Sequence, residues 1–414
     1  MIQAPRGTQD IYGEDMKIWR RVEESIRGIT EAYGFEEIRV PVFENTELFL
    51  RGVGDTTDVV QKEMYTFEDK GGRSLSLRPE QTASTARAYI ERGMFNLPQP
   101  TKLFYIGPNF RYERPQEGRY RQHYQFGVEV FGAGSFATEA EVISLGWELL
   151  TSLGVKGVSV HINSIGCPDC RKVYHANLKK FLGERMESLC GLCVSRFEKN
   201  PLRVLDCKNS NCRELLENVP SVLDALDDEC TAHFEGLKDL LTRMGIPFIV
   251  DAKIVRGLDY YTRTVFEFIK DGLTVIGGGR YDGLISQIGG AETPAVGYGM
   301  GMERLVLLLQ KQSVAWEDNS APQIFIGSAD AAGFVKAQQL VYELRKAGVR
   351  AQSDLLNRSV KAQMKFADKI KARFTMIIGE SELLENSANL KNMQSGEQTK
   401  LSLSCVKTIR QTLL

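Results

Sequence analysis

Two apolar runs on either side of an arginine-rich segment constrain the fold more than any other feature of the sequence. The runs are "KLFYIG", residues 102–107, and "QFGVEVFG", residues 125–132, and both have the pattern of strands buried in an antiparallel sheet. The segment 111–124 joins them and contains no lysine. Its charged side chains are Arg111, Glu113, Arg114, Glu117, Arg119 and Arg121. The pattern predicts a β-hairpin whose loop holds arginines above a sheet.

This loop is a candidate anion site because of its arginines. Arginine presents a planar fork of donors that fits a phosphate or carboxylate group, whereas lysine is a point charge. The alternative is a solvated loop in which Glu113 and Glu117 balance the arginines.

The remaining patterns predict an α+β protein of two domains. The first, 1–320, is expected to hold a mostly antiparallel sheet with helices, and the second, 322–414, to be a small α/β domain after a polar linker at 312–322. Expected helices lie at 14–33, from about Glu80, at 333–347 and at 359–372. Expected strand segments lie at 35–43, 254–269, 273–284, 323–328, 349–355 and 374–379. The sheet pattern of the first domain is expected to close in the small-residue stretch 294–309, where Arg304 stands at the start of an apolar helix. Ile18, Val22, Ile26 and Ile29 are expected on one face of the first helix.

Residues 168–250 are expected to form a helical, cysteine-rich insertion in the first domain. "CPDC" and "CGLC" are two C-x-x-C pairs whose spacing is typical of a four-thiolate zinc site. The first-choice ligands are Cys167, Cys170, Cys190 and Cys193, and Cys207 and Cys212 are the alternates. Four thiolates leave no open position for substrate, so such a zinc would be structural. Buried or incidental thiols are the alternative.

Composition excludes two classes of protein. The net charge is −1 and no apolar run reaches the length of a membrane span, and the sequence does not begin with a charged-then-apolar leader. We therefore expect a cytoplasmic protein that contacts no membrane. Any nucleic acid must be bound by local basic patches rather than by the field of the whole chain.

The expected helices of the second domain carry such a patch. Its basic residues are Lys336, Arg345, Lys346, Lys361, Lys365, Lys369, Lys371 and Arg373. They indicate either an RNA-binding surface or an ordinary solvated helix face.

Arginines and carboxylates from several parts of the first domain suit a site with two opposite charges. The arginines are Arg111, Arg119, Arg256 and Arg304, and the carboxylates are Glu80, Glu113 and Glu129. Polyphosphate requires the first set, and an ammonium or imidazolium group requires the second. The sequence contains neither a P-loop nor a G-x-G-x-x-G fingerprint, so this nucleotide site would be of another kind.

Several motifs resemble those of one enzyme family. "GFEEIRVPVFE" with Pro41, "FRYERPQEGRYRQHYQFGVE" and "GYGMGMERL" resemble the first, second and third signature motifs of class II aminoacyl-tRNA synthetases. "PRGTQD", "RGLDYYTRTVFEF" and "GGGRYDGL" resemble segments of the histidyl-tRNA synthetase family. The resemblance implies a class II catalytic domain, a C-terminal anticodon-binding domain, a homodimer formed through the motif-one region, and ligation of histidine to the 3′ end of tRNA(His) with ATP and Mg²⁺.

The resemblance also implies roles for individual residues. Arg111 would hold the α-phosphate of ATP, Glu113 the adenine amino group, Arg119 the outer phosphates, and Arg304 the adenine ring and γ-phosphate. Arg256 would face Arg111 across the α-phosphate as a second catalytic cation. The histidine-binding residues would be Glu80, Thr82, Gln125, Glu129, Tyr261 and Tyr281.

One non-enzymatic alternative is a synthetase-like regulatory subunit that lacks the anticodon-binding domain and motif residues. The presence of residues 322–414 and of Arg111, Arg256 and Arg304 favours the enzyme.

Overall fold

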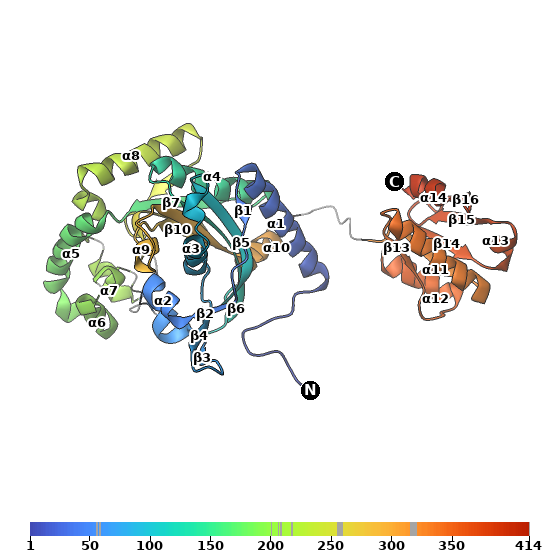
Figure 1. Ribbon diagram of the computed structural model, residues 1–414, viewed down its shortest axis with the longest axis horizontal. Helices are drawn as coiled ribbons and strands as arrows, with labels where there is room; N and C mark the ends of the chain where they lie inside the picture. Colours follow the sequence, from blue (N-terminus) through green and yellow to red (C-terminus); the bar gives the residue numbers. More distant parts are fainter. Residues whose placement is uncertain are drawn as a thin grey trace. The chain divides into compact units, whose positions relative to one another are not determined.

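The chain consists of two compact units, Met1–Val314 and Ala315–Leu414 (Figure 1). The structure is a computed structural model. It describes residues 1–54, 57, 59–199, 201–205, 207, 209–216, 218–254, 260–314 and 321–413. Among these residues, no helix combines the length and apolar character needed to cross a bilayer.

A mixed sheet forms the centre of the first unit. Within the described residues its eight strands have the order β1-β5-β6-β11-β10-β9-β7-β8. Their bounds are β1 Glu36–Glu37, β5 Thr101–Phe110, β6 Gln122–Phe131, β7 Ser159–Ser164, β8 Phe248–Val250, β9 Thr262–Lys270, β10 Leu273–Arg280 and β11 Ala295–Gly301. The two outer pairs, β1 with β5 and β7 with β8, are parallel, and the inner pairs are antiparallel. The predicted mostly antiparallel sheet is therefore confirmed.

The predicted hairpin is the pair β5 and β6. Its register runs from Thr101 opposite Phe131 to Phe110 opposite Gln122. Apolar side chains such as Phe126 are fully buried, so the hairpin supports the arginine loop from a rigid sheet.

Helices pack against this sheet, and their bounds are α1 Gly13–Ala32, α3 Thr82–Glu91, α4 Phe136–Ser152, α9 Leu284–Gln287 and α10 Met302–Lys311. In α1 the buried stripe is Trp19, Val22, Ile26 and Thr30. Ile18 and Ile29, predicted on the same face as Val22 and Ile26, are half-buried beside this stripe. Trp19 takes the central place because its ring packs edge-on against Tyr124, and Thr30 is accommodated because its hydroxyl donates to the Ile26 carbonyl.

The single strand expected at 35–43 divides between two sheets. The first part of the segment contains β1, at the edge of the main sheet, and its last residue is the first of β2, Phe43–Asn45. Strand β2 belongs to a small sheet of order β2-β4-β3, in which β4 is Ser74–Leu77 and β3 is Thr66–Glu68. Between β1 and β2, Arg78 Nη1 binds the carbonyls of Val40 and Pro41. Pro41 has no N–H for a ladder, so the backbone leaves the sheet here. Helix α2, Thr46–Val53, and a π-helical turn, Val59–Glu63, follow.

Residues after β7 form a group of helices beside the sheet (Figure 1). They are α5 Pro168–Gly183, α6 Gly191–Lys199, α7 Ser210–Leu215 and α8 Asp228–Arg243, with 3₁₀ turns at Met186–Ser188, Pro201–Val204 and Val222–Ala225. Their small core combines apolar residues with Cys193, Cys207 and Cys212. We call this segment the insertion.

The second unit contains a sheet of order β13-β12-β14-β15-β16. Its elements are β12 Ile324–Ser328, α11 Ala331–Lys346, β13 Ala351–Ser353, α12 Val360–Lys369, β14 Phe374–Ile378, α13 Glu380–Leu384, β15 Ser387–Asn392, β16 Gln398–Ser402 and α14 Val406–Leu413. The predicted alternation of strand and helix is present up to β14. The antiparallel β15 and β16 were not predicted, because their polar residues give little apolar periodicity.

Candidate active site

Residues from distant parts of the sequence meet at one cavity of about 580 Å³ in the first unit. The predicted site residues along its wall are Glu80, Thr82, Arg111, Glu113, Arg119, Gln125, Tyr261, Tyr281 and Arg304. Glu129 is fully buried behind this wall and contacts Thr82 and Tyr281. Arg256 lies outside the described residues.

Glu129 is the centre of a buried hydrogen-bond network. Its Oε1 accepts hydrogen bonds from Thr82 Oγ1 at 2.8 Å and from Tyr105 Oη at 3.0 Å, and its Oε2 accepts one from Tyr281 Oη. Tyr105 was missed by the sequence analysis. The Tyr105 ring fits here because the residue directly opposite on β6 is Gly127. A Cβ at that position would lie only 2.3 Å from the ring.

Glu80 provides a second buried carboxylate at the start of α3. Its Oε2 accepts from the Thr82 N–H at 2.7 Å and its Oε1 from the Ala83 N–H at 2.9 Å. Burial raises the pKa of Glu80 despite these hydrogen bonds and the charge of Arg111. Two carboxylates with little access to water disfavour each other's ionisation, so this end of the cavity favours a bound cation.

Glycines on β11 make room for two of the predicted histidine-binding residues. Gly297 lies opposite Glu129, and Gly299 lies opposite Gly127, two residues from Gln125 on β6. A Cβ at Gly297 would approach Glu129 Oε2 to 2.0 Å, and one at Gly299 would approach Gln125 Nε2 to 2.0 Å. The alternation in "GYGMG" therefore leaves space for polar side chains on the neighbouring strand, which the sequence pattern alone did not indicate.

Arg111 and Arg304 bring positive charge to the same cavity. Arg111 Nε donates to the Pro79 carbonyl at 2.8 Å, and Arg304 Nη1 donates to the Thr274 carbonyl at 2.7 Å. Burial lowers the pKa of His123 to about 3, and the charges of Arg111 and Arg304 add to the effect. His123 is therefore neutral, and a polyanion at this position would meet two anchored guanidinium groups.

The other two loop residues predicted to bind ATP contact each other. Arg119 Nε forms an ion pair with Glu113 Oε2. Arg121 lies over the Tyr112 ring with its Cζ 3.8 Å from the centroid, and its backbone N–H donates to the Gly7 carbonyl. The N-terminal segment thus packs on the arginine loop and stabilises it.

Tyr260 was not predicted as a site residue, although it lines the cavity. Its ring centroid lies 4.7 Å from that of Tyr261 and 5.4 Å from that of Tyr281. The sequence feature that could have indicated Tyr260 is the pair of tyrosines in "LDYYT". In a regular strand, successive side chains point to opposite faces, so only one of the two would face the cavity. Both are buried here, and both precede the first residue of β9, Thr262.

We expect Glu129 to be protonated at neutral pH in the free protein. Burial raises its pKa to about 8, although hydrogen bonds from Tyr281 and Thr82 act in the opposite direction. The measurement is a pH titration of the infrared carbonyl band of a protonated carboxyl group. The band should disappear as the pH rises through about 8, and it should be missing in Glu129→Gln.

The raised pKa of Glu129 also makes the stability of the fold depend on pH. Between the ordinary value of 4.5 and about 8 the folded state binds the proton more tightly than the unfolded chain, so the contribution of Glu129 to stability falls as the pH rises through that interval. The prediction would be contradicted if the infrared carbonyl band were lost with a midpoint near the ordinary pKa of a glutamate.

The insertion cysteines form two separate groups in the part of the chain that the structure describes. The first is Cys190, Cys193, Cys207 and Cys212, and the second is Cys167, Cys170, Asp227 and Cys230. In each group the candidate ligand atoms lie within 4.8 Å of one another. The first-choice set of Cys167, Cys170, Cys190 and Cys193 is therefore split. The reason is α5, whose 16 residues extend for about 24 Å between the two pairs. The alternates Cys207 and Cys212 lie with Cys190 and Cys193 instead.

Comparison with known proteins agrees with this geometry. The family model for histidyl-tRNA synthetase matches residues 7–170 and 197–305, and the model for an anticodon-binding domain matches 324–411. The chain is 51% identical over 403 residues to the histidine–tRNA ligase of Clostridium perfringens, with 97% of both chains covered. This chain belongs to the histidyl-tRNA synthetase family. Its function is accordingly that of an aminoacyl-tRNA ligase that joins histidine to tRNA.

Other members of the histidyl-tRNA synthetase family support the assignment over the full length. The histidine–tRNA ligase of Acetivibrio thermocellus is 49% identical over 407 residues, covering 97% of this chain and 98% of that protein. The crystal structure of apo histidyl-tRNA synthetase from Staphylococcus aureus has a TM-score of 0.85 and 38% identity, with 99% of this chain and 100% of that one covered. The class II fold and the anticodon-binding domain expected from the motifs are confirmed.

Proposed function

We propose that the residues at the cavity carry out both steps of histidine ligation to tRNA(His). The observation that supports this assignment is the presence of both buried carboxylates and anchored arginines at one cavity. Glu80 and Glu129 are buried at its wall, and Arg111 and Arg304 are anchored there by hydrogen bonds to backbone carbonyls. Histidine with its ammonium group suits the carboxylates, and MgATP as substrate suits the arginines.

In the first step, a carboxylate oxygen of histidine attacks the α-phosphorus of ATP, and pyrophosphate leaves. No side chain has to act as a covalent nucleophile, so the protein contributes positioning and electrostatic stabilisation. Arg111 would contact the α-phosphate, and Arg304 the γ-phosphate and adenine. Glu113 would turn from Arg119 toward the adenine amino group, which would release Arg119 to the outer phosphates.

Glu80, Thr82, Gln125, Glu129, Tyr261 and Tyr281 would bind histidine. In this assignment the substrate ammonium group favours the ionised form of Glu129 and replaces its proton. Arg256 is proposed as the second cation at the α-phosphate on the basis of the sequence motif.

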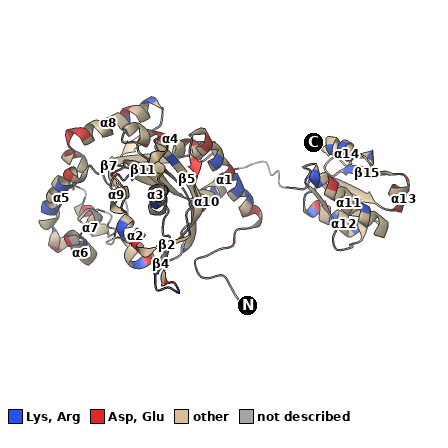
Figure 2. Cartoon of the chain, in the orientation of Figure 1, with Lys and Arg blue, Asp and Glu red and all other residues tan. Residues whose placement is uncertain are grey.

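In the second step, a ribose hydroxyl of the terminal adenosine of tRNA(His) attacks the acyl carbon of histidyl-adenylate, and AMP leaves. We propose that the second unit binds the anticodon end of the tRNA. Lysine and arginine are visible on α11 and α12 (Figure 2). Arg345, Lys346, Lys361, Lys365 and Lys369 on these helices are exposed.

Removal of the second unit tests this division of labour. A variant that ends at Ala321 is expected to retain histidine-dependent ATP–pyrophosphate exchange but to lose charging of tRNA, because the first unit has its own core and contains the cavity. The full-length chain, assayed with each of the other amino acids, is the control for substrate selectivity. Full charging by a folded truncated protein would contradict the proposed role of the second unit.

A homodimer through the motif-one region is supported by exposed apolar side chains. Phe43 on β2 and Phe67 on β3 are 53% and 44% exposed, and the neighbouring Val42 is 39% exposed. A patch of this kind favours burial against another protein surface. We also propose that the protein works in the cytoplasm, where aminoacylated tRNA is used.

We propose one structural zinc at Cys190, Cys193, Cys207 and Cys212. The sulfur atoms of Cys190 and Cys207 are 3.8 Å apart, which equals the edge of about 3.8 Å in a tetrahedron with Zn–S bonds of about 2.3 Å. Cys193, Cys207 and Cys212 belong to the insertion's core. A zinc here would therefore stabilise a segment whose apolar core is small.

A further inference from the structure

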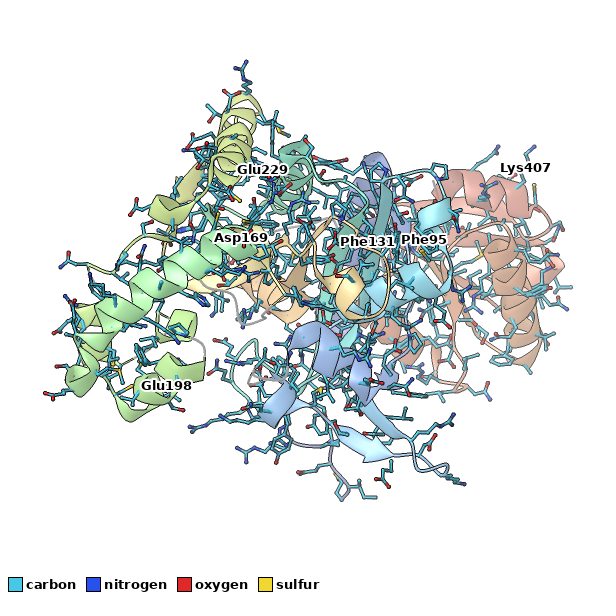
Figure 3. All side chains as sticks on the ribbon, turned by 60° about the vertical axis from the view of Figure 1, so that its left-hand side comes forward. Phe95, Phe131, Asp169, Glu198, Glu229 and Lys407 are labelled. Carbon is cyan, nitrogen blue, oxygen red and sulfur yellow. The ribbon has the colours of Figure 1, made fainter. Side chains whose placement is uncertain are left out.

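A second group of potential metal ligands lies where the insertion begins and ends. Cys167 and Cys170 lie at the start of α5, and Asp227 and Cys230 at the start of α8. Figure 3 labels Asp169 and Glu229, which mark the first turns of the two helices. The sulfur of Cys167 is 3.2 Å from Asp227 Oδ2, so residues 60 positions apart in sequence are in contact.

The distances in this group suit a four-coordinate ion. The sulfur atoms of Cys167 and Cys170 are 3.6 Å apart, close to the edge of about 3.8 Å expected between two zinc-bound thiolates. This separation is too long for a disulfide, in which the sulfurs are about 2.05 Å apart. All four ligand atoms lie within 4.8 Å of one another.

The residues around this group are packed so that its four side chains lie close together. Cys170 and Cys230 are 3% and 2% exposed. Gly166 has a φ of +69°, and a Cβ on it would lie 2.4 Å from the Cys170 Cβ. Asp227 caps α8 through its Oδ1, which accepts from the Cys230 N–H at 2.7 Å, and this leaves Oδ2 directed at Cys167.

We propose that Cys167, Cys170, Asp227 and Cys230 bind a second zinc ion, which joins the two ends of the insertion. Three thiolates select a soft or borderline ion over Mg²⁺ or Ca²⁺, and a single carboxylate completes a tetrahedral Cys₃Asp set. The set would carry four negative charges. The ion would offset two of them, and the positive ends of the α5 and α8 dipoles would stabilise the remainder.

This ion would also hold the strand that leads to the histidine pocket. Arg171, next to Cys170, donates from Nη1 to the Tyr261 carbonyl at 3.1 Å. The Ile165 N–H donates to the Arg263 carbonyl at 2.7 Å, and the Arg263 N–H donates to the Gly166 carbonyl at 2.9 Å. The metal-binding loop is therefore hydrogen-bonded to the start of β9 on both sides of Thr262.

Metal content of the full-length protein tests the proposal. Wild type purified without chelator is expected to contain two equivalents of zinc per chain, and Cys230→Ser one equivalent less than wild type. Cys212→Ser should remove the other equivalent, and Cys405→Ser, at an exposed cysteine of the second unit, should match wild type. Equal zinc content in wild type and folded Cys230→Ser would overturn the proposal.

A second variant covers the case in which Cys230→Ser does not fold. Asp227→Cys should retain the full metal content, and after Co²⁺ replacement it should show stronger thiolate-to-cobalt charge-transfer absorption than wild type because one more thiolate binds. An unchanged spectrum would overturn the proposal, as would a disulfide between Cys167 and Cys170 in protein purified under reducing conditions. These measurements do not depend on catalysis, so their failure would leave the proposed roles of the cavity residues untouched.

Discussion

Arg111→Lys is expected to lower the rate of histidine-dependent ATP–pyrophosphate exchange by about 10²–10³, the usual effect of removing one oriented donor from a developing negative charge. Arg111 Nε donates to the Pro79 carbonyl, which fixes the plane of the guanidinium group at the cavity. Lysine preserves the charge but has neither this anchor nor the planar fork. The loss should appear mainly in kcat, because the contact strengthens as charge builds up at phosphorus.

Arg114→Lys is the matched control for this experiment. Arg114 lies in the same loop, but it is exposed and is not among the residues that line the cavity. We expect exchange within about twofold of wild type, since a solvated surface arginine contributes little. Comparable losses in the two variants would show that the loop needs its total charge rather than an oriented group at position 111.

The largest expected effect on stability is that of Glu139→Gln, which should lower the free energy of unfolding by about 3–5 kcal/mol. Arg280 is fully buried and donates from Nε and Nη2 to the two carboxylate oxygens of Glu139 at 2.7 and 2.6 Å. His233 Nε2 on α8 lies 2.6 Å from Glu139 Oε1. The amide would leave the Arg280 charge without its fully buried partner. Chemical denaturation followed by circular dichroism provides the measurement.

Glu148→Gln, at an exposed position on the same helix, is the control and should change stability by no more than about 0.5 kcal/mol. The pH dependence gives a further check. Burial opposes ionisation of Glu139, but hydrogen bonds from Arg280 and His233 outweigh it, and the pKa is lowered. The stabilisation is therefore present above the ordinary value of 4.5 and is lost as the pH falls through the lowered pKa. A difference between wild type and Glu139→Gln that did not shrink in acid would contradict this account.

The parts of the fold that could be predicted from sequence are those set by local pattern. The β5 and β6 hairpin follows from apolar residues at both ends of one short loop, and the motifs place Arg111 and Arg304 at one site. The Glu139–Arg280 pair could not be predicted, because its partners are 141 positions apart and no local pattern indicates that they meet.

The cysteines show a different limit of sequence reasoning. Spacing identifies C-x-x-C pairs, but it does not say which pairs meet, because that depends on the length and direction of the helix between them. Asp227 and Cys230 had no metal-binding pattern of their own and are joined to Cys167 and Cys170 only by the return of the chain at α8. For Arg256, which lies outside the described residues, the proposed role rests on sequence alone.

The position of β11 in the sheet has a consequence for the order in which the cavity forms. Strand β11 lies between two hairpins of adjacent strands, β5 with β6 and β9 with β10. Hairpins are expected to form early because their contacts are local, whereas β11 has to pair with a strand of each hairpin. Glu129 lies on one hairpin, and Tyr281 follows the other. We therefore expect the proposed histidine pocket to be completed when β11 docks, and to be among the last parts of the sheet to form and the first to be lost on unfolding.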